Sequence, residues 1–146
     1  MIKSFVDNFI KDIYKERILF ELSSNKPNKR EKAFTKLLDY KEYFKSDIEK
    51  IDLTHLTGEE ILNIINTKYN AKECYSLKYD RKLQLEKAVI NTINSYMLDI
   101  LIIDEKNIIY IGEVGDHNEG GMASIKFISS RYHQLLQPLC LSLWVC

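Results

Sequence analysis

Apolar residues at three- and four-residue spacing dominate the first half of the chain and predict helices. The first stripe consists of Ile2, Phe5, Val6, Phe9, Ile10 and Ile13. This spacing is typical of an amphipathic helix, which we expect over about 2–22, before the polar break at 23–28. A second stripe predicts a helix over 29–45, with Asn28 as its N-cap.

Two further helices are expected downstream. Thr57 and Glu60 have the spacing of a capping box, which predicts a helix over 58–68. A stripe after Asp80 predicts another over 82–95, with Asp80 as its cap. Between the second and third helices, the segment 47–55 fits neither period. We interpret it as a connection that Ile48, Ile51 and Leu53 anchor.

The second half of the chain carries the signals of strands. Two runs rich in Ile, at 98–104 and 107–113, flank a short polar break and predict a β-hairpin. Partial alternation predicts further strands over 73–79 and 123–129. The expected fold class is α+β, with a helical N-terminal half followed by a β-α-β-β-β unit that forms a mainly antiparallel sheet. We expect one domain over 1–146, because the chain has the length of one domain and shows no internal repeat, low-complexity tract or linker.

The segment 134–146 (QLLQPLCLSLWVC) has no charged residue and differs in composition from the rest of the chain. Three interpretations remain open. The segment is either a final buried strand, or a surface that meets a partner, or an altered C-terminus. An exposed segment of this composition would favour aggregation.

Composition excludes several classes of function. The 21 basic and 21 acidic residues give no net charge, so the chain has no overall basic bias toward nucleic acid or membranes. The cysteines lack the spacing of a zinc site, and the N-terminal residues lack the apolar core of a signal peptide. No apolar run approaches the length of a membrane span. We therefore expect a cytoplasmic protein with no cofactor and no membrane partner.

Acidic residues gather at the predicted hairpin and after it, which suggests a binding surface. We expect a small non-enzymatic module that recognises another macromolecule, most plausibly a protein, as small bacterial immunity or regulatory proteins do. An acidic patch can attract a basic partner, and Tyr is favoured at interfaces. The candidate binding residues are Asp99, Asp104, Tyr110, Glu113, Asp116, His117 and Glu119.

The alternative is a divalent-metal-dependent nuclease or phosphodiesterase. Such enzymes of the restriction-endonuclease type place one acidic residue on a strand and Glu-x-Lys on the next, so that the carboxylates hold a metal that activates water. Asp99 or Asp104 followed by Glu113 imitates this arrangement, but Gly115 occupies the lysine position. Lys126 on the next strand would have to supply the amine.

Other chemistry has weaker support. Asp116, His117 and Glu119 could ligate a metal, but their spacing in a Gly-rich loop is not specific, so we assign no metal site. Nucleic acid is a less plausible partner than protein. Its contacts would be the basic residues just before and within the second predicted helix, namely Lys26, Lys29, Arg30, Lys32 and Lys36. The oligomeric state does not follow from the sequence.

Overall fold

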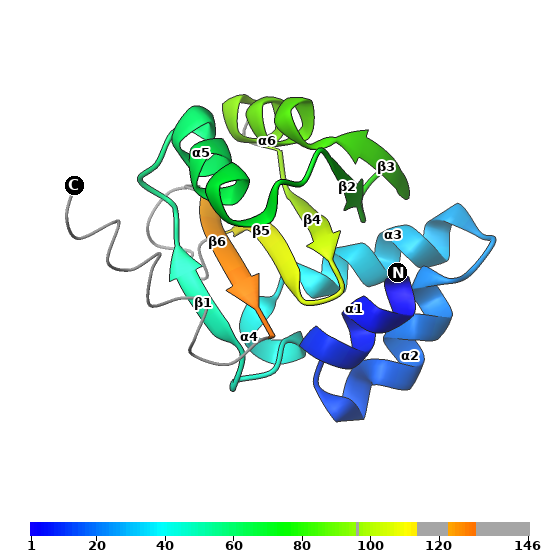
Figure 1. The fold of residues 1–146 in the computed structure, drawn as a ribbon. Helices are drawn as coiled ribbons and strands as arrows, with labels where there is room; N and C mark the ends of the chain where they lie inside the picture. Colours follow the sequence, from blue (N-terminus) through cyan, green and yellow to red (C-terminus); the bar gives the residue numbers. More distant parts are fainter. Residues whose placement is uncertain (96, 114–122, 131–146) are drawn as a thin grey trace.

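A six-stranded antiparallel sheet forms the centre of the computed structural model, which describes residues 1–95, 97–113 and 123–130 (Figure 1). The strand order is β1-β6-β5-β4-β2-β3. The strands are β1 (Glu49–Asp52), β2 (Glu73–Ser76), β3 (Arg81–Gln84), β4 (Asp99–Asp104), β5 (Asn107–Glu113) and β6 (Ala123–Ser129). The helices are α1 (Ile2–Phe9), α2 (Asp12–Leu22), α3 (Pro27–Leu37), α4 (Tyr40–Tyr43), α5 (Gly58–Tyr69) and α6 (Leu85–Asn94). The predicted α+β class is confirmed.

Helices cover both faces of the sheet, because alternate side chains of a strand point to opposite faces (Figure 1). Ile100, Ile102 and Ile108 pack with the buried residues of α1, α2 and α3. Leu101 and Ile109 pack with those of α5 and α6. The apolar runs over β4 and β5 therefore supply two hydrophobic cores, one on each face.

The helix expected over 2–22 is two helices, because the chain becomes extended at Ile10. Ile10 forms an antiparallel bridge with Phe44. The amide of Lys45 donates to the carbonyl of Phe9 over 2.9 Å. A contact with a distant segment therefore interrupts the helix, and Ile13, expected on the buried stripe, is 81% exposed. The helix expected over 29–45 is likewise divided into α3 and α4.

Two expectations in the middle of the chain were wrong. The segment 47–55 contains β1, which pairs with β6 at the edge of the sheet, with Ile51 opposite Phe127. Asp80 does not cap a helix, since it has φ 53° and lies in the turn between β2 and β3. Helix α6 begins only at Leu85. The capping function of Thr57 is confirmed, because its hydroxyl accepts a hydrogen bond from the amide of Glu60 over 3.2 Å.

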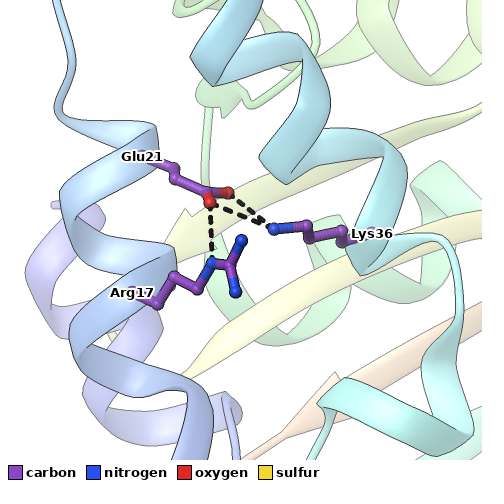
Figure 2. A network of polar contacts seen from close by, with 3 residues as sticks. All are labelled: Arg17, Glu21 and Lys36. Atoms are coloured by element: carbon purple, nitrogen blue, oxygen red, sulfur yellow. Dashed lines mark hydrogen bonds and ion pairs between the residues drawn. The ribbon is translucent and has the colours of Figure 1, made fainter.

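A polar network joins α2 to α3 (Figure 2). The carboxylate of Glu21 accepts hydrogen bonds from Lys36 at 3.0 and 3.2 Å and from Arg17 at 3.0 Å. Burial raises the pKa of Glu21, but these hydrogen bonds outweigh burial and hold the pKa below its ordinary value. The network therefore contributes to the attachment of α3, which borders the candidate site described next.

Two further expectations concern the C-terminal segment and membrane spans. The segment 134–146 lies outside the described residues, so its three interpretations stay open. Within 1–95, 97–113 and 123–130, no helix is long and apolar enough to cross a membrane.

Candidate functional site

A pocket of about 460 Å³ lies between the β2–β3 turn, α6 and the beginning of β4. This volume is within the usual range of ligand sites. Three of its lining residues are cationic, namely Lys78, Arg81 and Lys87, and one, Asp99, is acidic. Amide and hydroxyl side chains complete the polar lining, contributed by Gln84, Asn91, Thr92 and Ser95. The pocket therefore suits a polar ligand that carries negative charge.

Asp99 fixes the inner side of the β2–β3 turn. Its side chain is 1% exposed, and its carboxylate accepts hydrogen bonds from the Ser76 hydroxyl over 2.5 Å and from the amides of Lys78 and Ile100 over 3.1 and 2.7 Å. The Ser76 oxygen in turn accepts a hydrogen bond from the amide of Tyr79 over 3.1 Å. Asp99 thus holds the backbone of the turn against β4.

Burial raises the pKa of Asp99 above its ordinary value, and the hydrogen bonds from Ser76 and the two amides only partly oppose this effect. The carboxylate is therefore costly to bury in its charged form. It remains in the fold because three donors satisfy it.

Asp80 fixes the outer side of the same turn. Its carboxylate forms an ion pair with the Arg30 guanidinium of α3, with 3.4 Å between Nε and Oδ2. The hydroxyl of Tyr75 donates to the other oxygen of Asp80. Asp80 adopts the left-handed conformation, which Asp tolerates better than most residues. The turn is consequently attached to β4 at one side and to α3 at the other.

This doubly attached turn presents an exposed aromatic ring between two cations. Tyr79 is 46% exposed. The ammonium of Lys78 lies 5.5 Å from its ring centroid, and the guanidinium carbon of Arg81 lies 5.7 Å from it. Tyr and Arg are enriched among the residues that dominate binding energy at protein interfaces. The rim of the pocket therefore combines charge with a fixed aromatic surface.

The structure separates the candidates that the sequence grouped at an acidic end. Asp99 and Asp104 lie at opposite ends of β4. Asp104 accepts hydrogen bonds from the amide of Lys106 and the side chain of Asn107, each over 2.8 Å, and so stabilises the β4–β5 turn. Tyr110 is 1% exposed and donates its hydroxyl hydrogen to the carbonyl of Leu38. Neither Asp99 nor Tyr110 is available at the surface.

The remaining candidates end β5 or follow it in the chain. Glu113 is the last residue of β5 and pairs with Ala123, two residues beyond the Ile111 that lies opposite Asp99. Asp116, His117 and Glu119 lie outside the described residues. Within the described part of the chain, no group of three or more His, Cys, Asp and Glu side chains could hold a metal ion.

The basic residues expected to contact nucleic acid mostly have partners within the fold. Lys29 lies over the ring of Phe20 at 5.1 Å, Arg30 pairs with Asp80, and Lys36 pairs with Glu21. Lys26 and Lys32 are exposed. This face of α3 is therefore used largely for packing and for support of the β2–β3 turn.

Sequence reasoning missed the cationic residues of the pocket. The pattern places Lys78 in a strand, Lys87 in a helix and Arg81 between the two, and gives none of them a role. The available signal was the polar segment around Asp80 between two short alternating runs, which is typical of a hairpin.

Comparison with family models, with curated proteins and with solved structures found no match for this chain.

Proposed function

We propose that this chain is a binding module that recognises another protein through an acidic, extended segment of that partner. The segment would bind at the pocket and its rim, which we define as the cationic rim: Lys78, Tyr79, Arg81 and Lys87. The observation that carries the proposal is the attachment of this rim's turn at two points, through Asp99 and Asp80.

Charge supports an acidic partner. Three cations line the pocket, while its acidic residue, Asp99, is buried and hydrogen-bonded. Oppositely charged surfaces steer association and disfavour wrong partners. A peptide carboxylate at the rim would meet an ammonium or a guanidinium group and would meet no exposed carboxylate among the lining residues.

Sheet topology supports an extended segment. Strand β3 contributes Arg81 and Gln84 to the pocket and is an edge of the described sheet, paired with β2 on one side. An edge strand can accept an additional strand, whose backbone supplies affinity and whose side chains supply specificity. Lys82 is exposed on β3, and cations on an edge strand discourage pairing with basic or neutral strands.

Rigidity supports binding as the role of this turn. A site held in its bound conformation before the ligand arrives loses less conformational entropy on association. The hydrogen bonds to Asp99 and the ion pair at Asp80 hold the backbone on both sides of Tyr79.

The proposed class of function is the one expected from the sequence, but the proposed binding surface is the cationic rim and not the acidic end of the sheet. Asp99 is buried and Asp104 stabilises a turn, so we assign the contact to cations instead. The nuclease alternative has less support, because Lys126, which would supply its amine, lies on the face of the sheet that α4 covers, opposite the pocket that Asp99 lines.

A charge-reversal pair tests the proposal. Lys87→Glu changes an exposed lysine in the first turn of α6, where an acidic residue is favoured by the helix dipole, so the variant should fold. Lys32→Glu is the control, because it makes the same change at an exposed position of α3, on the other face of the sheet. Fluorescence anisotropy would measure binding of a short peptide of alternating Glu and Val, with a Gln-for-Glu peptide and a single-stranded oligothymidylate as competitors.

We expect the acidic peptide to bind wild type and Lys32→Glu equally, and Lys87→Glu about tenfold more weakly, since repulsion replaces attraction at a rim position. The Gln peptide should compete poorly. Equal affinity for all three proteins would overturn the assignment to this pocket. Preferential, Lys87-dependent binding of the oligothymidylate would replace the protein partner with a nucleic acid.

A further inference from the structure

A second group of cations lies across the sheet from the pocket, around the ring of Tyr40. The ammonium nitrogens of Lys126 and Lys50 are 4.4 and 5.0 Å from the centroid of this ring. Lys41 follows Tyr40 in α4 and is exposed. Two cations from separate strands therefore meet at one aromatic side chain, and Lys41 is close enough for its charge to act on Lys126.

Sheet register explains the meeting of the two strand lysines. Strands β1 and β6 are antiparallel, with Asp52 opposite Lys126 and Lys50 opposite Ile128. Lys50 and Lys126 are therefore diagonal neighbours on one face of the sheet. On the same strands, Ile51 and Phe127 point to the other face and pack with the core beneath α5 and α6.

This arrangement is electrostatically costly for the unliganded protein. Burial lowers the pKa of Lys126, and the charges of Lys50 and Lys41 lower it further, while Asp52 opposes them. Asp52 is hydrogen-bonded by the amide and the hydroxyl of Thr54. Within the described ranges, no carboxylate forms an ion pair with any of the three lysines. Among the described residues, Asp52 lies opposite Lys126 in the strand register but forms no ion pair with it, so three positive charges lie near one acidic group.

We propose that Lys41, Lys50 and Lys126 form a binding site for a phosphate-type dianion beside Tyr40. A phosphoryl group offers several acceptor oxygens, so it can contact more than one ammonium group at once, and Lys is a common phosphate ligand. Phe44 stacks on Tyr40 at 4.8 Å and 18°, and the two ammonium groups also lie at this ring. The ring is thereby occupied, which favours a phosphoryl group over a stacked base.

The site is independent of the proposed peptide surface. It lies on the face of the sheet covered by α4, whereas the pocket lies on the face covered by α6. Loss of phosphate binding would therefore leave peptide binding at the pocket unaffected, and the reverse holds as well. Two sources can supply the same chemistry, namely a free phosphate or pyrophosphate ion and a phosphoryl group carried on a small organic molecule.

Thermal unfolding and lysine footprinting test the site. Pyrophosphate, inorganic phosphate and glycerol 3-phosphate would be titrated separately, against sodium chloride at matched ionic strength. The variants are Lys50→Met and Lys126→Met, which keep the apolar stems of the side chains. The matched control is Lys82→Met, because Lys82, like Lys50, is an exposed lysine on an edge strand. Acetylation of each lysine would be quantified by mass spectrometry with and without pyrophosphate.

We expect at least one of the phosphate ligands to raise the unfolding temperature of wild type and Lys82→Met more than chloride does. Both test variants should lose at least about tenfold in affinity, and pyrophosphate should protect Lys50 and Lys126 from acetylation but leave Lys82 reactive. A preference for pyrophosphate over glycerol 3-phosphate would assign the free ion, and the reverse would assign the organic phosphate. No phosphate effect beyond that of chloride, or an equal effect in Lys50→Met and Lys126→Met, would overturn the proposal.

Discussion

Ser76 donates its hydroxyl hydrogen to the buried carboxylate of Asp99 over 2.5 Å and, through the same oxygen, accepts the amide hydrogen of Tyr79. One hydroxyl therefore links the beginning of β4 to the tip of the β2–β3 turn. In the sequence, Asp99 is a candidate catalytic or steering carboxylate. In the structure, its side chain positions the β2–β3 turn. It holds the backbone that carries the cationic rim.

The hydrogen bonds to Asp99 should contribute measurably to the free energy of unfolding. Asp99→Ala removes the acceptor of three donors, two of them backbone amides, and should lower the free energy of unfolding by about 3 kcal/mol. Asp99→Asn keeps one acceptor oxygen and should cost about 1 kcal/mol. Urea unfolding at neutral pH would measure both. Equal costs for the two variants would show that the hydrogen bonds do not stabilise the turn.

The same residue predicts a pH dependence. Because the pKa of Asp99 is raised above its ordinary value of 3.8 in the folded state, the folded protein holds this proton more tightly than the unfolded chain does. The stability that wild type gains over Asp99→Asn should therefore be greatest below pH 3.8 and decline as pH rises through the folded pKa. A difference that grows with pH would contradict the raised pKa.

Glu21 should show the opposite dependence. Its pKa is held below its ordinary value of 4.5, so the stability that it contributes is present above pH 4.5 and is lost as pH falls through the folded pKa. Glu21→Gln should cost about 1–2 kcal/mol at neutral pH and much less in acid, because the ion pairs with Lys36 and Arg17 are partly buried. Denaturant unfolding across the acid range would measure this. A cost that does not change with pH would contradict the network in Figure 2.

Part of the fold follows from sequence periodicity, and the remainder depends on contacts between distant segments. The dense β-branched runs of β4 and β5 predict a hairpin because such residues favour strands. Asp80 was assigned to a helix cap because Asp is favoured both at caps and in turns. The choice between them depends on Arg30 and Tyr75, which bind Asp80 only in the folded chain.

The candidate site was predictable only in part, for the same reason. The sequence marks Asp99 as a candidate carboxylate, but its role depends on Ser76 and Lys78, which contact it only in the folded chain. The short strand β1 was missed because four residues give little periodicity, and its pairing with β6 makes it a strand. Lys50 and Lys126 consequently could not be connected to Tyr40 from the sequence.

Asp80 offers a test of the turn's outer attachment. Asp80→Asn keeps the tolerance for positive φ but loses the charge that pairs with Arg30, so it should cost no more than about 1 kcal/mol. Asp80→Val places a β-branched residue in the left-handed conformation and should cost about 1–3 kcal/mol more. Thermal unfolding would compare the two. If Asp80→Val were the milder change, the positive φ would be contradicted.

Gly112 provides a further test of the core beneath α4. A Cβ atom at this position would overlap the ring and hydroxyl of Tyr110, which is held by Tyr40, Phe44 and the carbonyl of Leu38. Gly112→Ala should therefore lower the free energy of unfolding by about 1–3 kcal/mol or more. Tyr110→Ala in the same chain should remove most of the extra penalty. Strictly additive effects in this double-mutant cycle would contradict the overlap.

The central claim is that the doubly attached β2–β3 turn and its pocket bind an acidic extended segment. The most direct test is a two-dimensional ¹H–¹⁵N NMR titration of the full chain with the Glu–Val peptide. We predict amide shift changes concentrated in residues 78–84 and 87–95, with little change in α3. Changes centred on Lys26, Lys29 and Lys32, or no changes at saturating peptide, would contradict the claim.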